Sequence, residues 1–126
     1  MGTGYKGGSK FYRSVGQNVL ITSNKYEFSG GYFGDNSTHG GNSTRNIISQ
    51  DNVNAAHDFY DKIAFGGIEQ RVNDNMRITR MNDGTVITIR EVSSSDGTPV
   101  VDINIKCSNH TGGLRSQKIH FVQEVS

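Results

Sequence analysis

The sequence predicts an α+β domain in which an N-terminal helical or irregular region and one clear helix pack on a four-stranded antiparallel sheet. Residues 76–124 contain four short runs of alternating residues separated by turn-forming segments, a pattern typical of an antiparallel meander. Before them, residues 49–67 carry apolar residues at helical spacing. Because such a helix has one apolar stripe, it would cover one face of the sheet and leave the other face open.

The pair Asp83-Gly84 is the sharpest turn signal in the meander. It predicts a two-residue type I′ turn, in which both central residues have positive φ. The register that follows gives one apolar face on the first hairpin: Met76, Ile78, Ile87 and Ile89. It gives an opposite polar face: Arg77, Thr79, Thr88 and Arg90.

The last two strands alternate in the same way. Their expected apolar side consists of Val101, Ile103, Ile105, Cys107, Ile119 and Phe121. Their expected polar side carries Asp102, Asn104, Lys106, Lys118 and His120. A solvated sheet surface would have a similar pattern. The functional interpretation rests on four residues that would meet on adjacent strands: Arg77, Arg90, Lys118 and His120.

The helix over residues 49–67 has both of its end signals. Ser49 or Asp51 can cap its N-terminus, and Gly66-Gly67 can end it. Its expected apolar stripe is Val53, Ala56, Tyr60, Ile63 and Ala64. His57 lies next to this stripe, where it is either a half-buried histidine at the helix–sheet boundary or a proton carrier for the site.

The N-terminal part of the single 126-residue domain is less informative. Residues 1–46 are rich in glycine, residues 18–28 are expected to be extended, and residues 29–46 form a long polar loop. Loops of this length are either functional, as lids or partner-binding loops, or disordered.

Several classes of function lack their sequence signals. The net charge of +1 argues neither for nor against nucleic acid, and no apolar run is long enough to span a membrane. The single cysteine, Cys107, excludes an intramolecular disulfide framework, and its expected place on the apolar face argues against nucleophilic catalysis. The sequence contains no cluster of acids and histidines with metal-ligand spacing and no phosphate-binding loop. We therefore expect neither a metal nor a cofactor.

Metal-independent RNA cleavage fits the polar face best. It requires a base for the 2′-hydroxyl proton, an acid for the 5′-oxygen and cations for the phosphorane charge. His120 could serve as acid or base, with Arg90, Arg77 and Lys118 around the phosphate. Further hydrogen bonds and charge would come from Thr88, Thr79 and Lys106. The second proton carrier stays open among three histidines: His57, His39 and His110.

The segment DGTVITIREVSSSDGTPVVDINI…QKIHFVQ, preceded by a helix with DKIAFGG, resembles the C-terminal toxin modules of bacterial polymorphic toxin systems, such as contact-dependent inhibition and Rhs effectors. The resemblance covers residues 59–122. Many of these modules are similar to the barnase/EndoU/colicin/RelE-like ribonuclease group, in which N-terminal helices pack on a four-stranded sheet whose open face cleaves RNA. Arg90 and His120 occupy matching kinds of position, but no strand glutamate stands in the place of the barnase base.

The resemblance implies a cytotoxic endoribonuclease acting on tRNA or another RNA. It also implies delivery as part of a secreted or cell-surface effector, action in the cytoplasm of the target cell, and a cognate immunity protein that covers the site. An acidic partner would suit the positive sheet face. Two alternatives remain: a non-catalytic nucleic-acid or protein-binding module, and a toxin with NAD-directed chemistry.

Overall fold

The structure, a computed structural model, describes residues 12–37, 41, 43–93, 96–107, 109 and 111–125. The α+β prediction is confirmed: these residues form two helices, a seven-stranded mixed sheet and a small two-stranded sheet. The predicted four-stranded antiparallel sheet is therefore too small, because three further strands extend the meander on its two sides.

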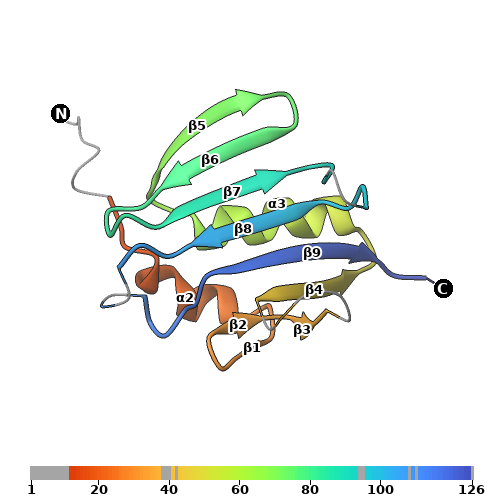
Figure 1. The fold of residues 1–126 in the computed structure, drawn as a ribbon, viewed down its shortest axis with the longest axis horizontal. Helices are drawn as coiled ribbons and strands as arrows, with labels where there is room; N and C mark the ends of the chain where they lie inside the picture. Colours follow the sequence, from red (N-terminus) through yellow and green to blue (C-terminus); the bar gives the residue numbers. More distant parts are fainter. Residues whose placement is uncertain are drawn as a thin grey trace.

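The large sheet has the strand order β3-β4-β9-β8-β7-β6-β5 (Figure 1). Its strands are β3 (Asp35–Asn36), β4 (Thr44–Ser49), β5 (Ile68–Asn73), β6 (Met76–Arg80), β7 (Val86–Arg90), β8 (Val100–Asn104) and β9 (Gln117–Gln123). The pair β4–β9 is parallel, and all the other pairs are antiparallel. The small sheet pairs β1 (Phe28–Ser29) with β2 (Tyr32–Phe33). The prediction of a loop over residues 29–46 is therefore wrong in part, because this segment contains β2, β3 and the first half of β4.

Helix α3 (Asn52–Ile63) covers one face of the sheet, and Figure 1 looks onto the opposite, open face. The Asp51 carboxylate accepts a hydrogen bond from the Asn54 amide, which confirms one of the two predicted caps. The buried residues of α3 follow helical spacing: Ala56, Phe59, Tyr60 and Ile63. Val53, predicted in this stripe, is 45% exposed, and Phe59 takes the central position instead.

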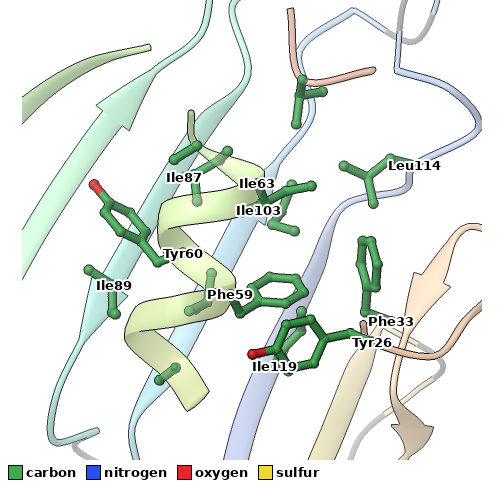
Figure 2. Packing of buried hydrophobic residues seen from close by; sticks show 14 of the residues in the cluster. Tyr26, Phe33, Phe59, Tyr60, Ile63, Ile87, Ile89, Ile103, Leu114 and Ile119 are labelled. Atoms are coloured by element: carbon green, nitrogen blue, oxygen red, sulfur yellow. The ribbon is translucent and has the colours of Figure 1, made fainter. Parts of the chain in front are cut away.

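Phe59 is the centre of the hydrophobic core (Figure 2). Its ring lies 5.3 Å from Tyr26, 5.0 Å from Phe33 and 5.6 Å from Phe121, measured between ring centroids. The rings of Tyr26 and Phe33 meet it edge-on, an arrangement that adds to the gain from burial alone. This cluster joins α3 to the N-terminal segment and to β9.

The prediction of an extended segment over residues 18–28 is wrong for its first part, because Gly16–Ser23 form helix α2. The β-branched residues in this segment favour a strand locally, but tertiary contacts override that preference. The Asn18 amide donates hydrogen bonds to the carbonyl oxygens of Ile63 and Phe65, at the C-terminal end of α3. On the same helix, Val19 and Thr22 are also buried. The helix therefore also satisfies carbonyl groups that α3 leaves free.

The predicted register of the first hairpin is wrong by one residue. Arg77 pairs with Ile89 and Ile78 with Thr88, instead of Arg77 with Arg90. The connection is a three-residue loop, since the Gly84 amide bonds to the Met81 carbonyl and the Met81 amide to the Thr85 carbonyl. Only Gly84 has positive φ, whereas a type I′ turn would also need it at Asp83.

A slip of one residue moves every side chain of β6 to the other face. Arg77 and Thr79 therefore point to the α3 side of the sheet, while Met76 and Ile78 lie on the open face. The hydroxyls of Thr79 and Tyr60 share a short hydrogen bond inside the molecule. The open face thus keeps only part of the polar set that the sequence predicts.

We expect Phe59→Ala to lower the free energy of unfolding by about 3–5 kcal/mol, because it opens a cavity where three aromatic rings meet. Urea unfolding followed by circular dichroism measures this loss. The matched control is Val53→Ala on the same helix, where a 45% exposed side chain should change stability by less than about 0.5 kcal/mol. Equal losses in the two variants would contradict the central role of Phe59.

Candidate functional site

The open face carries two rows of side chains that run across the strands. One row crosses β7, β8, β9 and β4 through paired residues: Arg90, Val100, His120 and Asn46. The next row crosses the same strands: Thr88, Asp102, Lys118 and Thr44. We call Arg90, Asp102, Lys118 and His120 the open-face cluster. It combines two cations with two groups that can carry a proton.

Asp102 lies in the middle of this cluster. Its carboxylate is 3.4 Å from the Arg90 guanidinium, and Lys118 is its cross-strand partner on β9. Burial raises the pKa of the Asp102 carboxyl above its usual value, although Lys118, Arg90 and His120 act in the opposite direction. A carboxylate with a raised pKa is a better proton acceptor, which is the property that a general base requires.

His120 is held so that one ring nitrogen is occupied and the other is not. Nδ1 hydrogen-bonds with the Thr98 hydroxyl at 3.0 Å and lies 3.4 Å from the Asp96 carboxylate. No described residue hydrogen-bonds to Nε2. The side chain is only 11% exposed, so the ring has little freedom to reorient. A fixed imidazole with one free nitrogen has the geometry of a general acid or base.

The segment after β7 supplies the groups that hold His120. The Asp96 carboxylate accepts hydrogen bonds from the hydroxyls of Ser93 and Thr98, both at 2.7 Å. The hydrogen bond from Ser93, and to a smaller extent the one from Thr98, hold the pKa of the Asp96 carboxyl well below its usual range. The Pro99 carbonyl accepts a bond from the Phe121 amide, which ties the segment to β9.

Asp102 and Lys118 of this cluster line an open groove of about 560 Å³, whereas Arg90 and His120 lie outside its lining. Its walls include side chains from four neighbouring strands of the sheet: Thr44, Thr88, Asp102 and Lys118. Thr44 and Thr88 bring hydroxyl groups to the same surface as the Lys118 ammonium. A groove lined by hydroxyls, a cation and a carboxylate suits a polar, anionic ligand.

A second polar cluster lies on the other side of the sheet. The Nη2 of Arg77 lies 2.8 Å from Nδ1 of His57, and Nε2 of His57 lies 2.7 Å from the Glu91 carboxylate. Because a guanidinium can only donate, Nδ1 accepts and Nε2 donates to Glu91. Both ring nitrogens of His57 are therefore engaged. The pocket that His57 shares with Arg77 and Glu91 is small, at about 80 Å³, and His57 also lines a larger pocket of about 680 Å³ between α3 and β4.

The predicted site residues are thus divided between two faces. Arg90, Lys118, His120 and Thr88 are brought together on the open face as expected. Three others lie on the α3 side, away from it: Arg77, Thr79 and His57. The register slip puts Arg77 and Thr79 on the α3 side, and His57 lies there because it belongs to α3.

Other predicted residues lie outside both clusters. β8 ends at Asn104, so Lys106 is an exposed residue beyond the strand, beside Gly84 of the hairpin loop. Cys107 is also exposed, and its predicted place on the apolar face is wrong. His39 and His110 lie outside the described residues.

The sequence predicts Asp102 on the polar face but gives it no part in the site. Two sequence features nevertheless point to Asp102 as a site residue: it alternates with Val101 and Ile103, and cations lie on the neighbouring predicted strands. Nothing local indicates that Asp96 and Thr98 would hold His120, since 22 residues separate Thr98 from that ring. The sequence gives no sign of the parallel partner Asn46, because this residue ends the segment predicted as a loop, residues 29–46.

Comparisons with known proteins give no match: no family model, no curated protein and no solved structure is similar to this chain. In the described part of the chain, no three His, Cys, Asp or Glu side chains are placed to hold a metal ion. Neither described helix is long and apolar enough to cross a membrane.

The lowered pKa of Asp96 predicts a pH-dependent contribution to stability. The folded pKa lies below the unfolded value of about 3.9, so the contribution is present above that pH and is lost as the pH falls toward the folded pKa. Asp96→Asn should lower the free energy of unfolding at neutral pH by less than about 1 kcal/mol, because water screens this half-exposed carboxylate.

Urea unfolding at neutral pH and near pH 3 measures the difference between the two proteins, which should shrink in acid. Asp61→Asn, which removes an exposed carboxylate on α3, controls for the change in net charge. An Asp96→Asn effect that stays constant or grows as the pH falls would contradict the assignment.

Proposed function

We propose that this protein is a metal-independent endoribonuclease and that the open-face cluster is its active site. The observation that carries the proposal is the meeting of Asp102 and His120 with Arg90 and Lys118. Asp102 pairs with Lys118, so His120, two residues further along β9, is its diagonal neighbour. The Cα atoms of such neighbours are typically roughly 7–8 Å apart. That separation leaves room for a phosphate between two proton carriers.

In the proposed reaction, the Asp102 carboxylate takes the proton of the ribose 2′-hydroxyl. The 2′-oxygen then attacks phosphorus, and the bond from phosphorus to the 5′-oxygen breaks. Nε2 of His120 gives its proton to the leaving 5′-oxygen, which leaves a 2′,3′-cyclic phosphate on one fragment. The cations of Arg90 and Lys118 stabilise the charge that develops on the phosphate oxygens.

In the free protein, the Arg90 guanidinium is paired with the Asp102 carboxylate, and a substrate phosphate can take the place of that carboxylate. Arg90 bonds to Asp102 at 3.4 Å, a long and partly exposed contact. A phosphate would offer the guanidinium two oxygens in a planar fork and would compete for it. The hydroxyl of Thr88, directly opposite Asp102, would add a hydrogen bond to the same anion.

The biological setting is proposed from the sequence resemblance. We propose a toxin module that cleaves tRNA or another RNA in a competitor cell after delivery by a larger effector, with an immunity protein that neutralises it. An acidic surface on that protein would match Arg90 and Lys118 and would also block the groove.

We expect the purified protein to cleave total tRNA in the presence of EDTA and to leave cyclic phosphate ends. His120→Ala and Asp102→Asn should each lower the cleavage rate about 10²–10⁴-fold, as expected for the loss of a general acid or base. Arg90→Ala should lower it about 10²–10³-fold through lost stabilisation of the transition state. Gel electrophoresis of labelled tRNA, with single-turnover kinetics, measures these rates.

Lys118→Ala and Lys62→Ala form a matched pair for this assay. Both remove one lysine charge, but Lys62 is on α3, where it bonds to Asp58. Only the Lys118 variant should lose activity. Intact RNA with the wild-type protein, or a fully active His120→Ala protein, would contradict the proposal. Loss of activity in His57→Ala with retention in His120→Ala would move the active site to the α3 side.

The same preparations separate the alternatives. Tight RNA binding without cleavage would indicate a binding module on the same basic face. Consumption of NAD without RNA cleavage would indicate the NAD-directed class of toxin.

A further inference from the structure

Strand β5 (Ile68–Asn73) forms one edge of the sheet and is exposed along its whole length. Among the described strands it pairs with β6 alone, and in Figure 1 its outer side faces away from the rest of the sheet. The other edge strand, β3, has only two residues. A six-residue edge with unpaired backbone amides and carbonyls can accept another strand. We infer that this strand pairs with β5 of a second copy, giving a two-fold dimer with one continuous sheet.

The sequence of β5 fits its own antiparallel copy. When the two-fold axis passes through Gln70, Glu69 of each copy faces Arg71 of the other. The two side chains lie on the same face in both copies, as pairs directly opposite each other must. Two opposite-charge pairs therefore form, one on each side of the central Gln70–Gln70 pair.

The neighbouring registers are excluded by charge. A two-fold axis through Glu69 would place two carboxylates opposite each other, and an axis through Arg71 would oppose two guanidinium groups. Because the two-fold axis stands perpendicular to the sheet, it must pass through a residue pair of the same number, and no intermediate register exists. Gln70 is thus the central residue that gives attraction at both flanking positions.

The ends of the strand agree with this register. Ile68 is 62% exposed and Val72 is 47% exposed, and in the dimer each faces the other across the two copies. Exposed apolar side chains on a free edge are a liability in a monomer. Val72 itself lies in the bulge between Arg71 and Asn73, so the regular part of the ladder ends at Arg71 and is short.

Charges on an edge strand usually prevent association with foreign strands. In β5 the two charges are placed so that they attract an identical antiparallel copy, which makes a second copy the partner that fits. Within each copy, the ion pair that Glu69 forms with Arg77 is long, at 3.8 Å, and the Glu69 side chain is 46% exposed at the edge. The open-face cluster stays accessible, because β6 and β7 separate β5 from β8.

Sedimentation equilibrium over a wide concentration series tests the inference with the whole chain. The interface is short and falls below the roughly 1,200 Å² of standard stable complexes, so we expect a weak, concentration-dependent dimer. Arg71→Glu creates two Glu–Glu pairs and should weaken association about tenfold or more. The double variant Glu69→Arg, Arg71→Glu restores both attractive pairs and should return the affinity to within about threefold of the wild type.

Arg115→Glu is the control, because it changes the net charge equally at an exposed position outside β5. It should leave the dimer unchanged, and thermal unfolding should confirm that every variant is folded. A wild-type protein that stays monomeric at all concentrations would overturn the inference. So would a dimer that survives Arg71→Glu, or a double variant that fails to recover. None of these outcomes depends on ribonuclease activity.

Discussion

Phe59 is where three separate parts of the chain meet, and the arrangement of the molecule depends on that contact. Its ring touches Tyr26 and Phe33 from the N-terminal segment and Phe121 from β9. These contacts hold α3 against one face of the sheet and fix β9 beneath it. Close packing of such rings leaves no space for a second helix on the same area. No helix of the described residues covers the opposite face, where β9 presents Lys118 and His120.

The second constraint is the hairpin loop at Met81–Thr85. With three loop residues instead of two, β6 turns over, so Arg77 joins His57 and Glu91 on the α3 side. The protein therefore has two polar clusters separated by the sheet. In one cluster both ring nitrogens of His57 are bonded; in the other, no described residue hydrogen-bonds to Nε2 of His120. This difference is why we place the active site on the open face.

The open-face cluster was predictable in part. Arg90, Thr88, Lys118 and His120 follow from alternation within single strands, which depends only on the pleat of the backbone. Asp102 follows from the same alternation, but its raised pKa depends on how deeply the strands around it bury it. The hold of Asp96 and Thr98 on His120 joins residues far apart in the chain, and no local pattern encodes such a contact.

By itself the sequence determined the helix, the four meander strands and the alternation of β7, β8 and β9, because these depend on propensity and periodicity over a few residues. It limited the helix cap to Ser49 or Asp51, and the structure shows Asp51. Only the tertiary structure decided the parallel pairing of β4 with β9, the helical state of α2 and the face on which Arg77 lies. Each of these depends on a contact between distant segments or on a loop one residue longer than the turn signal suggests. The proposed site depends on both: the alternation within strands puts its residues on one face, and the tertiary structure decides which residues contact one another.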